Sequence, residues 1–246
     1  MTGGQLALIL LASAIGATVK SVTGLGYPLI AVPIVSLVLG VEDAVVVVAI
    51  PNLAANVFLC WESREGRAGA RDLDRLIGVG VIGAVIGTIA LVNLPDAPLL
   101  LALAATIVVF VVQFVRRPEL RLDPVVARRW SPLAGLIAGL AQGAVGVSGP
   151  VVATWMHGYR LPVRVYIYSV TLIFGVTGAV QLSILIVQGK LTLDLLLGAA
   201  VASFAVAVCT PIGVRFRNRL AGATFDRIVL AVLVVSAASL VYDALG

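Results

Sequence analysis

Apolar runs long enough to cross a lipid bilayer recur along the sequence, and they constrain the fold more than any other feature. A helix of about 20 residues spans a hydrocarbon core of roughly 30 Å, and runs of this length recur from Leu6 to Leu245. Apolar residues make up 61% of the 246 residues and charged residues 12%, whereas about a quarter of the residues of a soluble domain are charged. The sequence therefore predicts an all-α, polytopic integral membrane protein surrounded by the lipid bilayer.

The apolar segments differ in length. Six of them are long enough to span a membrane as helices: residues 43–61, 75–93, 97–115, 163–188, 191–211 and 226–245. The remaining four segments are shorter and form two broken pairs, residues 5–20 with 26–40 and residues 131–145 with 149–158.

Both broken pairs are interrupted by stretches rich in glycine and proline, and the two stretches match each other. They read KSVTGLGYP at residues 20–28 and QGAVGVSGP at residues 142–150. A break at membrane depth is tolerated only where the freed backbone is buried in protein or lines a water-filled cavity. A shift of 122 positions (146 − 24) superposes Gly24 on Gly146 and also superposes the prolines that end the two stretches.

Three long segments follow each broken pair, so the chain is interpreted as a duplication. The first repeat comprises residues 1–115, with its broken hairpin at 5–40, and the second comprises residues 130–246, with its hairpin at 131–158. An arginine-rich linker, residues 116–129, joins them. The alternative is that any two glycine- and proline-rich membrane segments can be slid into register, but the repeated order of segments favours a duplication.

The distribution of basic residues predicts the orientation of the repeats. If each broken pair enters and leaves on one side, fifteen of the seventeen Lys and Arg residues fall on one face, which the positive-inside rule makes cytoplasmic. Only Lys190 lies on the other face, and Lys20 lies at a hairpin tip. Both termini are then outside, and the two repeats are inverted. Each repeat is predicted to be a broken or re-entrant helical hairpin followed by three transmembrane helices.

Inverted repeats with discontinuous helices are typical of secondary transporters, whose substrate lies near the midplane between the repeats. In each hairpin the second arm begins just after the break, so its first N–H groups lack intrahelical partners and carry the positive end of the helix dipole. Two such ends would form a cage for an anion. Gly24, Gly26, Gly146 and Gly149 would let the backbone approach a ligand, with close helix packing as the alternative.

Polar side chains at membrane depth add further candidates. Lys20 and its counterpart Gln142 precede the two breaks; a lysine there is costly unless it is solvated or paired, and the alternative is that it snorkels to the surface. Asn52 and Asn56 share a helix face and offer amide donors to anion oxygens, or else bond a neighbouring helix. Weaker candidates, whose polar groups often bond only the backbone, are Thr23, Ser148, Thr154, Thr177 and Gln181. The predicted substrate-binding residues are Lys20, Thr23, Gly24, Gly26, Tyr27, Asn52, Asn56, Gln142, Gly146, Ser148 and Gly149.

Missing residue patterns argue against several classes of function. The long spans contain no mid-membrane Asp or Glu, which argues against a carboxylate proton relay. No HExxH sequence, paired aspartates or nucleophile motif indicates an enzyme, so no catalytic residue is predicted. Cys60 and Cys209 belong to no Cys/His cluster, so no metal ion, disulfide or cofactor is predicted. The net charge of +5 is explained by the basic loops, so nucleic-acid binding is not predicted.

Two stretches carry a resemblance to a known family: GLGYPLIAVPIVSLVLG in the first half and GLIAGLAQGAVGVSGPVVATWM in the second. With the four-part repeats they resemble the TauE/SafE sulfite exporter family, also described as the 4-toluene sulfonate uptake permease group. The resemblance covers nearly the whole chain and rests on loose patterns of glycine, proline and small residues. It implies transport of small sulfur-containing oxyanions, such as sulfite or organosulfonates, across the cytoplasmic (inner) membrane of a prokaryote. It also implies that the substrate region lies at residues 20–28 and 142–150.

The sequence thus predicts a multi-pass secondary transporter that carries a small oxyanion by alternating access, with the substrate bound between the two hairpin tips. An anion channel of the same fold and a membrane scaffold subunit without transport are the alternatives. The substrate itself, the direction of transport and the coupling ion stay open, and a homodimer is compatible with the sequence.

Overall fold

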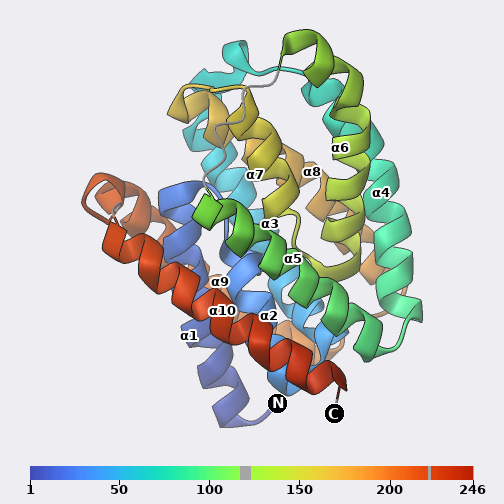
Figure 1. Cartoon of the computed structure of the whole chain (residues 1–246). Coiled ribbons are helices and arrows are strands. Elements are labelled where there is room, and N and C mark those ends of the chain that lie inside the picture. The colour runs from blue at the N-terminus through green and yellow to red at the C-terminus, as the bar shows by residue number, and fades with distance from the viewer. Residues whose placement is uncertain (117–122, 221–222, 246) are drawn as a thin grey trace.

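A computed structural model describes residues 1–116, 123–220 and 223–245, and every regular element in these ranges is a helix (Figure 1). The predicted all-α class is therefore confirmed. The first half contains α1 (Gly3–Thr23), α2 (Tyr27–Leu39), α3 (Val41–Glu62), the 3-10 helix η1 (Arg64–Gly69), α4 (Leu73–Asn93) and α5 (Asp96–Arg116). The second half contains α6 (Pro124–Val145), α7 (Gly149–Gly158), α8 (Val163–Val187), α9 (Leu193–Leu220) and α10 (Ala223–Leu245).

Within the described residues, six helices are long and apolar enough to cross a membrane: α1, α3, α4, α8 and the parts Asp96–Gln113 of α5 and Leu193–Phe216 of α9. All but α1 coincide with predicted spans. Helix α1 was expected to end at Lys20, but it continues to Thr23, where Gly24 in the left-handed conformation ends it. Helix α10 was also predicted to span, and its described apolar part is Leu233–Ala244. Helix α7 is a short arm of ten residues, as predicted.

Helix α6 begins earlier than the apolar pattern indicated, at residue 124 instead of 131. The Asp123 side chain caps it by accepting hydrogen bonds from the N–H groups of Val125 (2.8 Å) and Val126 (3.3 Å), and an Asp-Pro pair is a common start signal for a helix. Residues 124–129 of the predicted linker are therefore helical. Residues 117–122 of that linker lie outside the described residues.

The two breaks lie where the sequence placed them, and a glycine ends the first arm of each hairpin. Gly24 (φ 80°) ends α1 and donates its N–H to the carbonyl of Lys20, and Gly146 (φ 70°) ends α6 and donates to the carbonyl of Gln142. Both glycines adopt the left-handed conformation that disfavours other residues. The chain therefore reverses in the same way at both breaks.

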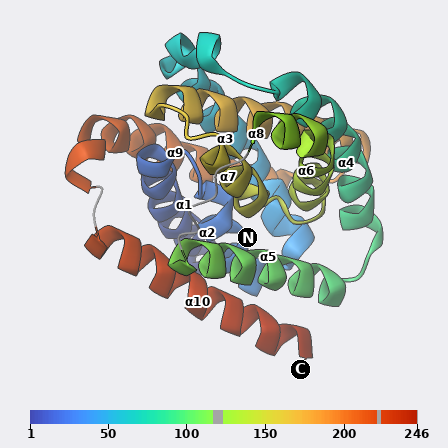
Figure 2. The same cartoon turned by 45° about the horizontal axis from the view of Figure 1, so that its top comes forward.

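The two halves of the chain pack against each other through reciprocal contacts between corresponding helices. The first helix of each half contacts the fourth helix of the other half, so that α1 packs on α9 and α6 packs on α4. Helix α3 packs on α8, and α5 lies beside α10 at one edge of the molecule (Figures 1 and 2). In Figure 1, α1 starts at the lower end beside both termini, whereas α6 starts at the upper end. Opposed hairpins of this kind are compatible with inverted repeats, which stay a prediction.

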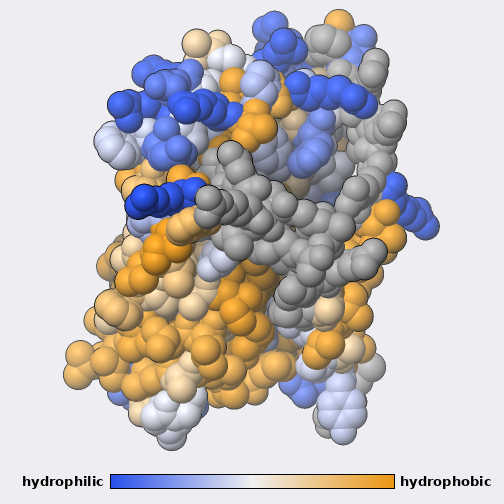
Figure 3. Space-filling model, turned by 90° about the vertical axis from the view of Figure 1, so that its left-hand side faces the viewer, coloured by the Kyte–Doolittle hydropathy of each residue, from blue (hydrophilic) through white to orange (hydrophobic). Residues whose placement is uncertain are grey.

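Polar and apolar surfaces are separated along the long axis of the molecule. Figure 3 shows hydrophilic residues gathered at the upper end and a broad hydrophobic band below them. Exposed large side chains such as Leu11 of α1 (61% exposed) and Phe204 of α9 (66% exposed) belong to the hydrophobic surface. Exposed apolar side chains of this size are expected where helices face lipid hydrocarbon.

Contacts at the ends of helices tie the two halves together at the arginine-rich end. Arg75 donates a hydrogen bond to the carbonyl of Arg128 (3.1 Å), and Arg164 at the start of α8 forms an ion pair with Glu65 of η1. The Tyr159 hydroxyl donates to the Asp72 carboxylate (2.8 Å). Burial, together with this hydrogen bond, raises the pKa of Tyr159.

The opposite end of the molecule has a corresponding ion pair. Lys190, in the loop after α8, lies 2.7 Å from Glu42 in the first turn of α3. The shift of 122 positions that aligns the breaks also aligns Glu42 with Arg164 (164 − 42). At one end, the start of α3 is therefore paired with the segment that follows α8, and at the other end the start of α8 is paired with the segment that follows α3. The acidic residue lies at the start of α3 in the first pair, whereas the basic residue lies at the start of α8 in the second.

Helices α4 and α6 approach so closely that an added Cβ atom would overlap the facing backbone at most of the glycines along their contact. A Cβ atom at Gly139 of α6 would overlap the carbonyl oxygen of Gly80, and one at Gly83 of α4 would overlap the carbonyl oxygen of Leu136. Small residues permit this kind of helix packing in membranes, where apolar burial drives association weakly. The glycines along the contact are Gly80, Gly83, Gly87, Gly135, Gly139 and Gly143.

We expect Gly139→Ala to destabilise the protein by about 2 kcal/mol, because the added methyl group must push α4 and α6 apart. The matched control is Gly78→Ala on α4, where an added Cβ meets no atom within 4 Å and alanine favours the helix by up to about 1 kcal/mol. The measurement is the midpoint of thermal unfolding in one detergent. Equal midpoints for the two variants would contradict the close contact of α4 with α6.

Candidate substrate site

The first break leaves buried backbone donors at the start of α2. Its first turn begins at Gly26, which provides no side-chain cap. The N–H groups of Gly26, Tyr27 and Leu29 have no acceptor among the described residues, and all three residues are buried. Because the positive end of the helix dipole lies at the same place, this turn is suited to an anion.

The second break repeats this arrangement at the start of α7. Ser148 precedes the helix without capping it, and the N–H groups of Ser148, Gly149 and Val151 have no acceptor among the described residues. Ser148 and Gly149 are buried. Buried unpaired N–H groups are rare in folded proteins, so two matching sets of them indicate a place for a ligand or water.

Lys20 is buried beside the first break with polar and aromatic neighbours. Its side chain is 1% exposed, and its Nζ donates to the Asn52 Oδ1 atom of α3 (3.0 Å). Nζ also lies 5.6 Å from the centre of the Phe174 ring of α8. Asn56 donates to the same Asn52 oxygen (3.4 Å), and its own Oδ1 atom is buried with no partner in the described ranges. The structure thus brings together three of the predicted residues.

Gln142 anchors a second cluster beside the second break. Its Nε2 donates to Gln181 Oε1 of α8 (3.1 Å), and its Oε1 accepts from the Ser148 hydroxyl (3.0 Å). The Gln181 amide in turn donates to the carbonyls of Gln142 (2.7 Å) and Gly143 (3.0 Å). Gln181 was a weak candidate from the sequence, and it holds the end of α6 in place.

Both breaks pack against the opposite half of the chain. A Cβ at Gly24 would lie 3.4 Å from Ile167 of α8, and one at Gly146 would lie 3.4 Å from Val45 of α3. Helices α3 and α8 contact each other, with Asn56 Cβ 3.7 Å from a Cβ placed on Gly175. The two polar clusters therefore lie along the seam between α3 and α8.

Open space lies beside this seam. An added Cβ at Gly149 of α7 or at Gly178 of α8 would meet no atom within 4 Å, although both glycines are buried. The other predicted glycines, Gly24, Gly26 and Gly146, have atoms within that distance. Of the four predicted glycines, only Gly149 borders open space.

Thr23 and Tyr27 bond to groups outside the two polar clusters. The Thr23 hydroxyl donates to the carbonyls of Val19 (2.9 Å) and Leu25 (2.7 Å). The Tyr27 hydroxyl lies 3.3 Å from Ser13 Oγ in the protein interior. These contacts favour structural roles for both side chains, in line with the tendency of hydroxyl groups in membrane helices to bond nearby carbonyls.

Sequence reasoning missed Phe174 and Gly178, although the duplication contained a signal for both. The shift of 122 positions aligns Asn52 with Phe174 (174 − 52) and Asn56 with Gly178 (178 − 56). Lys20 therefore contacts both members of one aligned pair. No single property of Phe174 or Gly178 would have indicated a site.

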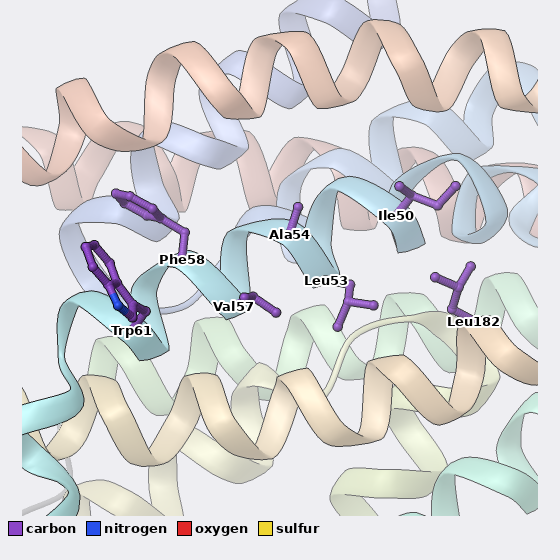
Figure 4. A pocket seen from close by; sticks show the side chains of 7 residues that line it. All are labelled: Ile50, Leu53, Ala54, Val57, Phe58, Trp61 and Leu182. Atoms are coloured by element: carbon purple, nitrogen blue, oxygen red, sulfur yellow. The ribbon is translucent and has the colours of Figure 1, made fainter.

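An apolar groove of about 600 Å³ lies on the other face of α3 (Figure 4). Helical periodicity places its α3 residues roughly opposite Asn52 and Asn56, and the groove has no charged lining residue. It is therefore separate from the polar clusters. The lining residues are Ile50, Leu53, Ala54, Val57, Phe58, Trp61 and Leu182.

The fold and the two interrupted hairpins place this protein in the class of polytopic helical membrane proteins. Its two helix breaks both face the seam between α3 and α8. The family model described as sulfite exporter TauE/SafE matches residues 8–240. The chain belongs to this family, whose members are membrane transporters, and the resemblance inferred from the two breaks is confirmed.

A curated relative supports the same assignment over part of the chain. The probable sulfite/organosulfonate exporter TauE of Cupriavidus necator is 34% identical over 116 residues, which cover 46% of this chain and 44% of the relative. The match therefore spans less than half of that protein. No solved structure matches the chain significantly.

We expect Gln181→Leu to destabilise the protein by about 1–3 kcal/mol, because the Gln142 side chain would lose its buried partner. The control is Ser183→Ala on the same helix, where an exposed hydroxyl bonds only the carbonyl of Ala179, with an expected change below about 0.5 kcal/mol. Thermal unfolding in detergent measures both. An unchanged midpoint for Gln181→Leu would show that the Gln181 contacts do not hold the end of α6.

Proposed function

We propose that this chain is a secondary transporter of a small sulfur-containing oxyanion, such as sulfite or an organosulfonate, across the cytoplasmic membrane of a prokaryote. The proposal rests on one observation above all, namely that buried, unpaired N–H groups start α2 and α7 beside the polar residues of the α3–α8 seam. The family and the name of the curated relative support sulfur chemistry. Alternating access between two repeats would expose this seam to each side in turn.

In the proposed site, both backbone N–H groups and side chains would bind the anion. The first turns of α2 and α7 would donate N–H groups to the anion oxygens, Lys20 would supply positive charge, and Asn52, Asn56 and Gln142 would supply amide donors. The open space beside Gly149 and Gly178 would hold part of the anion. Gly24, Gly26 and Gly146 would shape the two turns.

The direct test is uptake of labelled sulfite into proteoliposomes, with sulfate, thiosulfate, taurine and chloride as competitors. Saturable uptake that competitors inhibit supports a carrier and ranks its substrates. Very fast conductance without saturation would favour an anion channel. No uptake under any gradient would contradict transport and favour a scaffold role.

Asn52→Ala and Gln142→Ala are each expected to lower oxyanion transport by about tenfold, because each removes an amide that faces the site. Asn93→Ala is the matched control, since Asn93 is exposed at the end of α4 and its side chain bonds only the carbonyl of Ile89. Transport rates are compared at equal amounts of folded protein, measured by size-exclusion chromatography. Normal transport by both site variants would remove these side chains from the site.

Gly149→Ala and Gly178→Ala test the open space. An added methyl group meets no protein atom at either position, so both variants should keep the wild-type unfolding midpoint within a few degrees. A methyl group that occupies ligand space should weaken anion binding by about tenfold, so the transport KM should rise by about that factor. Unchanged KM values in both variants would place the substrate elsewhere.

A further inference from the structure

Lys20 is a buried lysine that has no anionic partner in the described part of the chain. Its side chain is 1% exposed, and its polar contacts are one amide oxygen, Asn52 Oδ1, and the face of the Phe174 ring. Among the described residues, no carboxylate lies within 4.0 Å of its Nζ. An unpaired ammonium group in a medium of low polarity is strongly disfavoured. These surroundings therefore favour the neutral amine over the ammonium group.

The titratable groups on neighbouring helices do not neutralise Lys20. On α3, Glu42 is paired with Lys190 at one end of the helix, and on α9 Asp194 is paired with the terminal amino group. On α2, Tyr27 has Ser13 as its partner. The other titratable residues on described parts of the helices that pack around Lys20 make no recorded contact with it: Asp43, Cys60, Glu62, Arg164, Tyr166, Tyr168, Cys209 and Arg215.

We propose that Lys20 takes up one proton when the oxyanion binds and releases it when the anion leaves, so that each anion crosses the membrane with one proton. This inference rests on the proposed function and names its coupling ion. The step is balanced: the neutral amine, a proton from the aqueous side and the anion form an ammonium–anion pair, and the reverse occurs on the other side.

The neighbours of Lys20 suit both states of this cycle. Asn52 Oδ1 accepts a hydrogen bond from either the amine or the ammonium group, and the Phe174 ring face attracts the cation. A bound anion supplies the missing negative charge, so anion binding and protonation stabilise each other by the same amount. Gln142, the counterpart of Lys20, carries no titratable group, so the predicted stoichiometry is one proton per anion.

The experiment measures accumulation of labelled anion in proteoliposomes under an imposed pH gradient. Labelled sulfite and methanesulfonate are used in parallel, because the sulfonate stays ionised and cannot itself carry the proton. For a singly charged anion at zero membrane potential, one proton per anion gives about tenfold accumulation per pH unit. A protonophore should abolish this accumulation, and protein-free liposomes control for leakage.

Two variants separate the role of Lys20 from general damage. Lys20→Gln keeps a hydrogen-bond donor toward Asn52, and glutamine already occupies the corresponding position, Gln142, in the second half. It should lose the response to the pH gradient, and exchange of internal for external anion should remain measurable but become slower, because the positive charge that binds the anion is lost. The control Lys190→Gln removes a lysine that pairs with Glu42 at the end of the molecule and should accumulate anion as the wild type does.

Each outcome decides between the proposals. Anion flux in the wild type that ignores the pH gradient would overturn proton coupling but leave the transport function intact. If the Lys20→Gln variant still accumulates anion under the pH gradient, the coupled proton binds at another residue and the proposal for Lys20 is overturned. If Lys20→Gln does not fold, Lys20→Arg replaces it: a permanent cation should exchange anion without gradient-driven accumulation, and accumulation would overturn the proposal. No flux of either anion in the wild type would overturn the proposed function together with this inference.

Discussion

A helix that stops inside a membrane protein must find partners for its backbone groups within the protein, because lipid hydrocarbon offers none. Here one carbonyl in the last turn of each interrupted helix has such a partner, since Gly24 donates to Lys20 in α1 and Gly146 donates to Gln142 in α6. The N–H groups that follow at the starts of α2 and α7 have no acceptor among the residues that the structure describes. These N–H groups and the helix dipoles give both breaks a partial positive charge, to which Lys20 adds a side chain at the first break.

The arrangement of the halves follows from where the breaks are held. Each tip packs on the third helix of the opposite half, with Gly24 against α8 and Gly146 against α3. The close glycine contact of α4 with α6 and the packing of α1 on α9 fix the first arms of the hairpins. The α3–α8 seam is therefore the one place that both breaks and both polar clusters share.

The breaks were predictable because glycine and proline act locally, through backbone conformation that neighbours along the chain determine. The starting point of α6 was also encoded locally, in Asp123, but an apolar pattern does not detect a cap. Lys20 and Asn52 could be proposed as site residues, yet their direct contact depends on where the packed helices place α1 relative to α3. Phe174 and the open space at Gly178 arise only from packing between the halves, so a search for polar residues could not find them.

The two ion pairs at the ends of the α3–α8 pair differ in their exposure to water. The side chains of Arg164 and Glu65 are 64% and 71% exposed, whereas those of Lys190 and Glu42 are 33% and 29% exposed. Dissolved salt screens exposed charges far more than half-buried ones. Rising ionic strength therefore weakens the link between the halves mainly at the arginine-rich end, so the two faces of the molecule respond unequally to the salt around them.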